Sequence, residues 1–81
     1  MYMLEFEEEK VRVGVKQSLK AILDDKVVKV YIAKDAEQYV TRRVIELANR
    51  SSVEIVFINT MKELGNACKI DVGAATAVII K

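Results

Sequence analysis

The sequence predicts an α/β fold in which helices cover both faces of a sheet. Short apolar runs with the composition of strands alternate with stretches of helical period, and the runs 27–33 and 75–80 are apolar at nearly every position. Strands of this kind need cover on both faces. The 81 residues include no proline, and no low-complexity stretch marks a linker. We therefore expect one domain spanning residues 1–81.

The first half of the chain contains a strand, a helix and a second strand. Residues 11–13 alternate like a short strand that Gly14 closes, and residues 15 to about 25 have helical period. The apolar positions of this helix are Val15, Leu19, Ile22 and Leu23. The run 27–33 is β-branched and nearly continuous, which is typical of a strand buried on both faces.

The next elements are a helix and another strand. Asp35 is followed by Gln38 three residues later, a spacing that predicts a helix N-cap, and the helix continues to about Arg50. Its apolar face consists of Ala36, Val40, Val44 and Leu47, whereas Ile45 falls on the opposite side. Residues 53–58 form a further candidate for a buried strand.

The last part of the chain begins with a capping box. Thr60 and Glu63 have its spacing, and a short helix follows with an apolar face of Met61, Leu64 and Cys68. Residues 70–74 form an unusually apolar loop before the last strand, 75–80. The predicted order is β-α-β-α-β-α-β. Residues 4–7 are ambiguous, because they alternate like a strand and also overlap a stretch that suits a helical turn.

The charges are segregated although their sum is small. Thirteen Lys and Arg face twelve Asp and Glu, a net charge of +1. Residues 1–9 carry −4, residues 10–34 carry +5, and the remainder sums to zero. Such blocks are usually solvated surface, so they favour an anionic partner only slightly.

The residue inventory argues against an enzyme and against a metal or cofactor site. The chain has no histidine and one cysteine, and its three glycines form no phosphate-binding motif. Cys68 lies at helical spacing with apolar residues, which favours a buried position over a nucleophile. Asp24 and Asp25 fit a solvated turn at a helix end. No apolar stretch is long enough to span a membrane, and the acidic start is no signal peptide, so we expect a cytoplasmic protein.

The start of the first helix is the first candidate site. Lys16, Gln17 and Lys20 share the side opposite the apolar positions, within the first two turns after Gly14. Two ammonium groups and an amide at a helix N-terminus suit phosphates and base edges. On periodicity alone, a solvated polar face is the commoner explanation.

The apolar loop is the second candidate site. Val72 and Gly73 lie at its centre, where loops normally expose polar residues. The loop either packs back on the core, which is commoner, or accepts a flat apolar partner such as an extruded nucleotide base. The two candidate sites lie at the same end of the sheet in one arrangement of the strands, which the sequence does not fix.

Four ordered motifs cover the chain from about residue 10. They are Gly14-Val-Lys-Gln-Ser-Leu-Lys-Ala21, Val30-Tyr-Ile-Ala-Lys-Asp-Ala36, Lys62-Glu-Leu-Gly-Asn-Ala-Cys68 and Ile70-Asp-Val-Gly-Ala-Ala75. Together they resemble the kink-turn-binding ribosomal-protein superfamily, which includes archaeal large-subunit and box C/D members, and especially its short bacterial members of the YbxF type. The resemblance implies a three-layer α/β/α sandwich on a mixed four-stranded sheet. It also implies binding of kink-turns, RNA internal loops in which tandem sheared G·A pairs adjoin a bulge.

The resemblance also assigns candidate residues. The family's Gly-x-Asn-Glu-x-x-Lys motif, which docks at the G·A pairs, falls on Gly14, Lys16, Gln17 and Lys20, with Lys-Gln in place of the archaeal Asn-Glu. Lys only donates hydrogen bonds, and Gln replaces a charged acceptor by a neutral amide, so affinity or base specificity can differ. The loop that contacts the bulged nucleotide falls on Asp71, Val72, Gly73 and Ala74, and Lys34 and Asp35 are weaker candidates for the same surface.

The sequence therefore predicts a monomeric RNA-binding protein that recognises a kinked internal loop and stabilises its bent form. Association with the ribosome stays open. The alternative is a protein-interaction or regulatory module on the same fold, because a fold does not determine function.

Overall fold

A computed structural model describes residues 10–81, and its helices and strands follow one another in the predicted order. The elements are β1 (Val11–Val13), α1 (Val15–Leu23), β2 (Val27–Ala33), α2 (Gln38–Arg50), β3 (Glu54–Ile58), α3 (Met61–Ala67) and β4 (Thr76–Ile80). The ambiguous residues 4–7 lie outside the described part of the chain.

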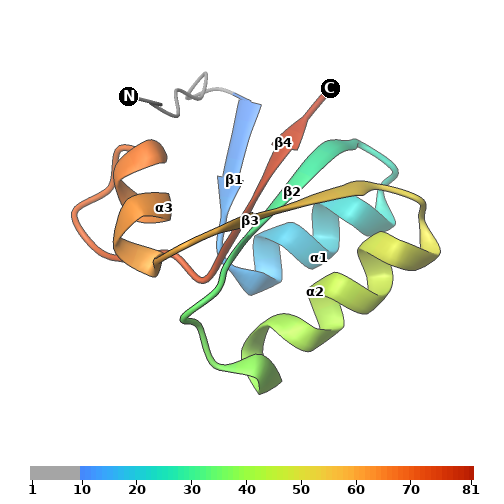
Figure 1. Cartoon of the computed structure of the whole chain (residues 1–81). Helices are drawn as coiled ribbons and strands as arrows, with labels where there is room; N and C mark the ends of the chain where they lie inside the picture. The colour runs from blue at the N-terminus through green and yellow to red at the C-terminus, as the bar shows by residue number, and fades with distance from the viewer. Residues whose placement is uncertain (1–9) are drawn as a thin grey trace.

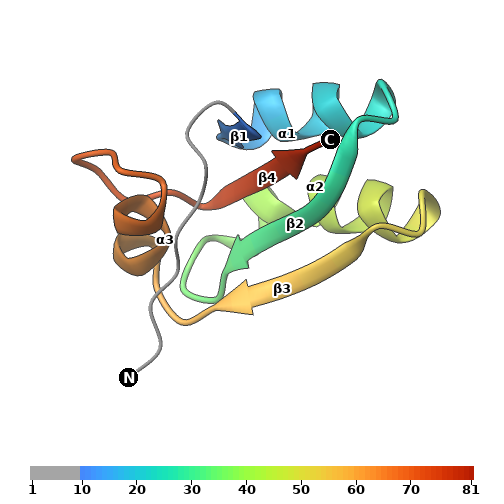
Figure 2. The ribbon, with the colours of Figure 1, turned by 90° about the horizontal axis from the view of Figure 1, so that it is seen from above.

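The strands form one mixed sheet in the order β1-β4-β2-β3. β4 runs antiparallel to both of its neighbours, β1 and β2, whereas β2 and β3 are parallel. Figure 2 shows β4 and β2 in the middle of the sheet, with β1 and β3 at its edges. The mixed four-stranded sheet is therefore confirmed.

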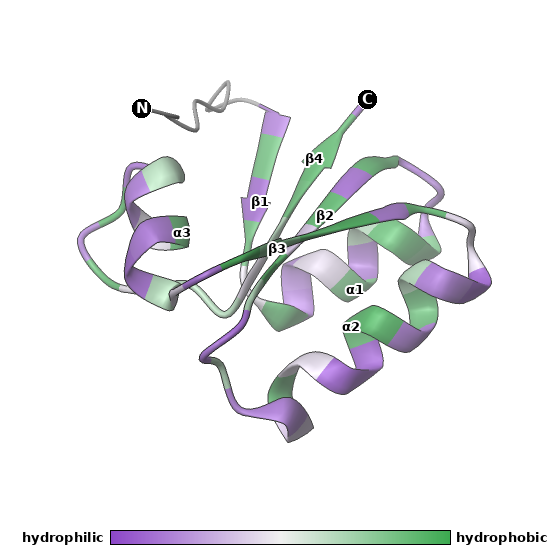
Figure 3. Cartoon of the chain, viewed as in Figure 1, coloured by the Kyte–Doolittle hydropathy of each residue, from purple (hydrophilic) through white to green (hydrophobic). Residues whose placement is uncertain are grey.

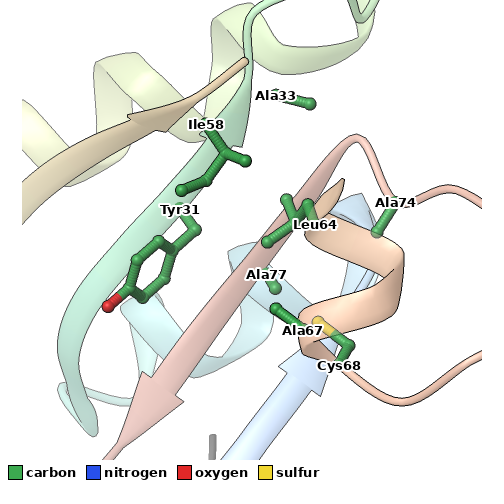
Figure 4. Close-up of a cluster of buried hydrophobic side chains, with 8 residues drawn as sticks. All are labelled: Tyr31, Ala33, Ile58, Leu64, Ala67, Cys68, Ala74 and Ala77. Atoms are coloured by element: carbon green, nitrogen blue, oxygen red, sulfur yellow. The ribbon is translucent and has the colours of Figure 1, made fainter. Parts of the chain in front are cut away.

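Helices cover both faces of the sheet, as the sequence predicts. α1 and α2 lie side by side on one face, and α3 covers the other (Figure 1). The buried side chains of β2 alternate between the two layers: Val30 and Ile32 pack with α1 and α2, while Tyr31 and Ala33 pack with α3. Figure 4 shows the second cluster, in which Leu64 of α3 points toward the sheet. The architecture is a three-layer α/β/α sandwich.

The buried face of α1 differs from the prediction. Leu23 was expected to face the core, but 71% of its surface is exposed. The buried residues are Ser18, Ala21 and Ile22, and Leu23 lies about 100° around the helix from Ile22. The side chains at positions 18 and 21 are small and fit between α1 and the sheet. The buried face of α1 is therefore centred on Ser18, Ala21 and Ile22 and leaves Leu23 outside.

The third strand is only partly buried. β3 was expected to be covered on both faces, but it lies at the edge of the sheet and Phe57 is 51% exposed. An edge strand has a neighbour on one side alone, so its outer side chains receive less cover. In the hydropathy colouring, β3 is nevertheless green over most of its length, as is β4, whereas α2 alternates between green and purple (Figure 3).

The N-cap predicted for α2 is also wrong. α2 begins at Gln38 and its N-cap position is Glu37, with no hydrogen bond from the side chain. Asp35 instead accepts a hydrogen bond from the backbone N–H of Met61, at 2.8 Å, and so caps α3. The capping box of α3 is confirmed, because the Thr60 hydroxyl accepts from the N–H of Glu63 at 3.0 Å.

The position of Ile45 in α2 now has an explanation. The fully buried residues of the helix are Thr41, Val44 and Ala48. Ile45 lies beside this face, partly buried, and packs on the same cluster as Leu47. Both flanks of the buried face are therefore apolar.

Candidate functional site

Backbone hydrogen bonds bring the two candidate segments to one end of the sheet. The N–H of Gly14, at the end of β1, donates to the carbonyl of Thr76, at the start of β4, at 2.9 Å. The N–H of Ala33, at the end of β2, donates to the carbonyl of Ala75 at 2.9 Å. Since residue 75 continues directly from the loop 70–74, this loop and the start of α1 flank the same end of the central strand pair.

Gly14 makes the sharp change of direction from β1 into α1. Its φ of +99° lies in the region that favours glycine, and it provides no side chain to cap the helix. The first turn of α1 has no acidic residue. The positive end of the helix dipole therefore acts together with the charges of the neighbouring lysines.

Lys16, Gln17 and Lys20 are all exposed, on the side of α1 that faces away from Ser18, Ala21 and Ile22. Two ammonium groups within the first six residues of the helix give this side a net positive charge, and the Gln17 amide adds a donor and an acceptor. We call these three residues the α1 polar face.

The loop 71–74 is anchored on α3 by a close backbone approach. The N–H of Ala74 donates to the carbonyl of Met61 at 3.0 Å. A methyl group at Gly65 would overlap the carbonyl oxygen of Val72, and one at Gly73 would come within 3.0 Å of the Met61 Cβ. Glycine at positions 65 and 73 is therefore what allows the loop to lie against this helix.

The loop divides into an exposed part and a buried part. Asp71 and Gly73 are exposed, and Val72 presents 69% of its surface to solvent. Ala74, in contrast, is 4% exposed and belongs to the cluster beneath α3 (Figure 4). The packing on the core is thus confirmed for Ala74, whereas Val72 is an apolar side chain exposed on the surface.

Lys34 is exposed next to this end of the sheet, and its N–H donates to the carbonyl of Ile58 at 2.7 Å. Asp35 points instead to α3, as described above. The sequence-based reasoning did not single out Lys62, an exposed cation that follows Met61 in the chain. The carbonyl of Met61 holds Ala74, so Lys62 belongs to the helix turn on which the loop is anchored, which only the tertiary contact reveals.

The residues set aside as structural behave as expected. Cys68 is buried, and burial raises the pKa of its thiol above the ordinary value. Asp24 and Asp25 are exposed at the end of α1, and Asp25 has a φ of +57°. Within residues 10–81, no cluster of three potential metal-ligating His, Cys, Asp or Glu side chains occurs, and no helix has the length and apolarity to cross a membrane.

Comparison with known proteins gives relatives over most of the chain. The chain is 58% identical over 65 residues to an RNA-binding protein of Caldanaerobacter subterraneus subsp. tengcongensis, covering 80% of this chain and 79% of that protein. It is 36% identical over 72 residues to the RNA-binding protein YbxF of Geobacillus stearothermophilus, covering 89% and 88% of the two chains.

The fold is also shared with a solved structure. The Giardia lamblia 15.5kD RNA binding protein superposes with a TM-score of 0.85 at 28% sequence identity, covering 90% of this chain and 62% of that one. Residues 4–81 match the family described as ribosomal protein L7Ae/L30e/S12e/Gadd45. The four motifs, the three-layer sandwich and these matches agree, and the chain belongs to the ribosomal protein L7Ae/L30e/S12e/Gadd45 family.

Proposed function

We propose that this protein binds RNA, recognises kink-turn internal loops, and stabilises their bent form by binding it more tightly than the extended form. The relatives named above are RNA-binding proteins, which supports a binding role rather than catalysis. The resemblance of residues 14–20 and 70–75 to the kink-turn-binding motifs supports the choice of RNA element.

The observation that carries the proposal is the hydrogen bond between Gly14 and Thr76. It joins the start of α1 to the strand that follows the loop, so the α1 polar face and the loop that carries the exposed Val72 flank the same end of the sheet. Kinked RNA offers two features to such a surface, namely base edges and phosphates in a groove and a nucleotide turned out of the stack.

The α1 polar face provides contacts to the groove. Lys16 and Lys20 donate hydrogen bonds to guanine edges or phosphates, and the amide of Gln17 both donates to and accepts from base edges. Because lysines are few at this surface, non-specific attraction to phosphates is modest and the shape of the RNA contributes much of the selectivity.

The loop provides the contact to the extruded nucleotide. Val72 offers an apolar surface to a base, Asp71 and Gly73 flank it, and Ala74 holds the loop on the core. Lys34 adds a positive charge near the same end of the sheet. A single copy of the domain is enough to bind one RNA element in this arrangement.

Calorimetric titration tests the proposal with two RNAs of equal length, one with tandem G·A pairs beside a three-nucleotide bulge and one in which those pairs are Watson–Crick. We expect 1:1 binding to the first RNA and at least about tenfold weaker binding to the second, because each lost base-edge contact costs roughly 1–3 kcal/mol. Equal affinities would contradict kink-turn recognition.

The contribution of Lys20 is tested in the same titration. Lys20→Ala should weaken binding by about 1–3 kcal/mol and leave the melting temperature unchanged, because the side chain is exposed. Arg50→Ala is the control, since Arg50 is an exposed cation at the C-terminal end of α2 and belongs to neither candidate segment. An equal loss in both variants would indicate general electrostatics.

A further inference from the structure

A hollow on the β1 side of α1 collects three cationic side chains. Its volume is about 190 Å³, and it lies between α1, β1, the turn after α1 and the end of β4. The charged residues that line it are Arg12, Lys20, Lys26 and Asp24. Three positive charges against one negative charge leave the hollow with a net attraction for anions.

Hydrogen bonds hold the backbone on two sides of the hollow. The N–H of Lys26 donates to the carbonyl of Ala21 at 3.1 Å, and the carbonyl of Lys26 accepts from the N–H of Lys81 at 2.8 Å. Arg12 is paired with Val78 in the sheet, and its Nη1 donates to the carbonyl of Val11 at 2.9 Å. The backbone positions from which these two cationic side chains extend are therefore held before an anion binds.

The hollow is continuous with the α1 polar face. Gln17 and Lys20 belong to both, so the hollow extends the positive surface from the start of α1 toward its end. Lys16 and Asp24 are eight residues apart, about 12 Å along the helix axis. A polyanion bound at the start of α1 passes over the hollow if it follows the helix.

We propose that this hollow binds a backbone phosphodiester of the RNA stem that leads away from the kink, with Arg12, Lys20 and Lys26 as its cationic contacts. The inference rests on the function proposed above. It adds to the interface two residues, Arg12 and Lys26, that neither of the candidate segments includes. Asp24 repels the phosphate and weakens the attraction. Because the contact is made to the RNA backbone, it positions the RNA and reads no base.

Measurement of the salt dependence of RNA binding tests this contact. A lysine that neutralises one phosphate contributes about one to the slope of log K against log salt. Lys26→Ala should therefore lower the steepness of this slope by about one and weaken binding several-fold at low salt, for the kink-turn and the Watson–Crick RNA alike. Asp24→Asn should strengthen binding to both RNAs, because it removes the opposing carboxylate.

Arg50→Ala is the matched control, because it removes one positive charge outside the hollow, and its slope should equal that of the wild type. A Lys26→Ala slope equal to that of the wild type would overturn the proposal, as would unchanged binding in Asp24→Asn. Failure of the proposed function is a separate result: the wild type would bind both RNAs equally, whatever the slopes of the variants.

Discussion

The carboxylate of Asp35 caps a helix that begins 26 residues later in the chain. Its Oδ1 accepts a hydrogen bond from the N–H of Met61 at 2.8 Å, and the carbonyl of Met61 accepts from the N–H of Ala74 at 3.0 Å. The turn after β2, the start of α3 and the loop 71–74 are thereby linked through a single residue. Asp35, which is itself exposed, thus supports the position of the loop through the start of α3.

Asp35→Ala removes this cap. We expect the free energy of unfolding to fall by about 1 kcal/mol, the usual effect of losing a capping carboxylate, as measured by urea denaturation. Asp35→Asn is the control, because its side-chain oxygen still accepts a hydrogen bond and should preserve most of the stability. An equal loss in both variants would mean that the charge, and not the hydrogen bond, is what matters.

Gly65→Ala tests the close approach of the loop to α3. Alanine is normally favoured over glycine inside a helix by about 1 kcal/mol, but here the methyl group would overlap the Val72 carbonyl. The clash should reverse the sign and lower the free energy of unfolding by on the order of 1–3 kcal/mol. Asn66→Ala, at an exposed position of the same helix, should be neutral or slightly stabilising. Stabilisation by Gly65→Ala would show that the loop is placed elsewhere.

Val72→Ser tests the apolar contact to the extruded base. The side chain is 69% exposed, so we expect little change in melting temperature but weaker binding to the kink-turn RNA, by about 1 kcal/mol. Val28→Ser is a matched control in β2, since Val28 is 52% exposed and belongs to neither candidate segment. Calorimetry measures the affinity of both variants for the kink-turn RNA. If Val72→Ser binds as tightly as Val28→Ser, Val72 is not part of the interface.

The Cys68 thiol should react slowly in the folded protein. Burial raises its pKa, so at pH 9, where an ordinary thiol is about half ionised, less thiolate forms at this position than on an ordinary thiol. The pKa of the Cys68 thiol is higher in the folded protein than in the unfolded chain, so the protonated thiol favours folding. Its contribution to the free energy of unfolding is fully present below the unfolded-state pKa and is lost as pH rises toward the folded-state pKa.

Ellman's reagent measures this reactivity with and without urea. We expect labelling in native buffer to be far slower than that of glutathione, and fast labelling in urea, where the thiol is exposed. Labelling of the native protein at the rate of glutathione would contradict the burial of Cys68.

The succession of elements could be predicted because it depends on local patterns. The β-branched run 27–33 and the Thr60 capping box are readable from neighbouring residues, and β2 and α3 start where these patterns place them. The buried face of α1 was harder to predict. Ser18 is polar and Ala21 is only weakly apolar, so the pattern favoured Leu23, whereas the buried face of the helix contains these small side chains.

The layout of the site needed tertiary information. The pairing of β1 with β4 brings Gly14 to Thr76 across 62 positions of the chain, and no local pattern predicts that pairing. The same limit applies to Asp35, whose spacing to Gln38 is that of a local cap although its partner is Met61. The residue types of the candidate site were visible in the sequence, while their juxtaposition came from the sheet.

Stabilisation of the bent RNA is the central claim, and fluorescence energy transfer between dyes on the two RNA arms tests it most directly. In a buffer without added Mg²⁺, addition of the protein to the kink-turn RNA should raise the transfer efficiency and saturate at one protein per RNA. The Watson–Crick RNA should show no change. Binding of the kink-turn RNA without a rise in transfer efficiency, or an equal rise for both RNAs, would contradict the account.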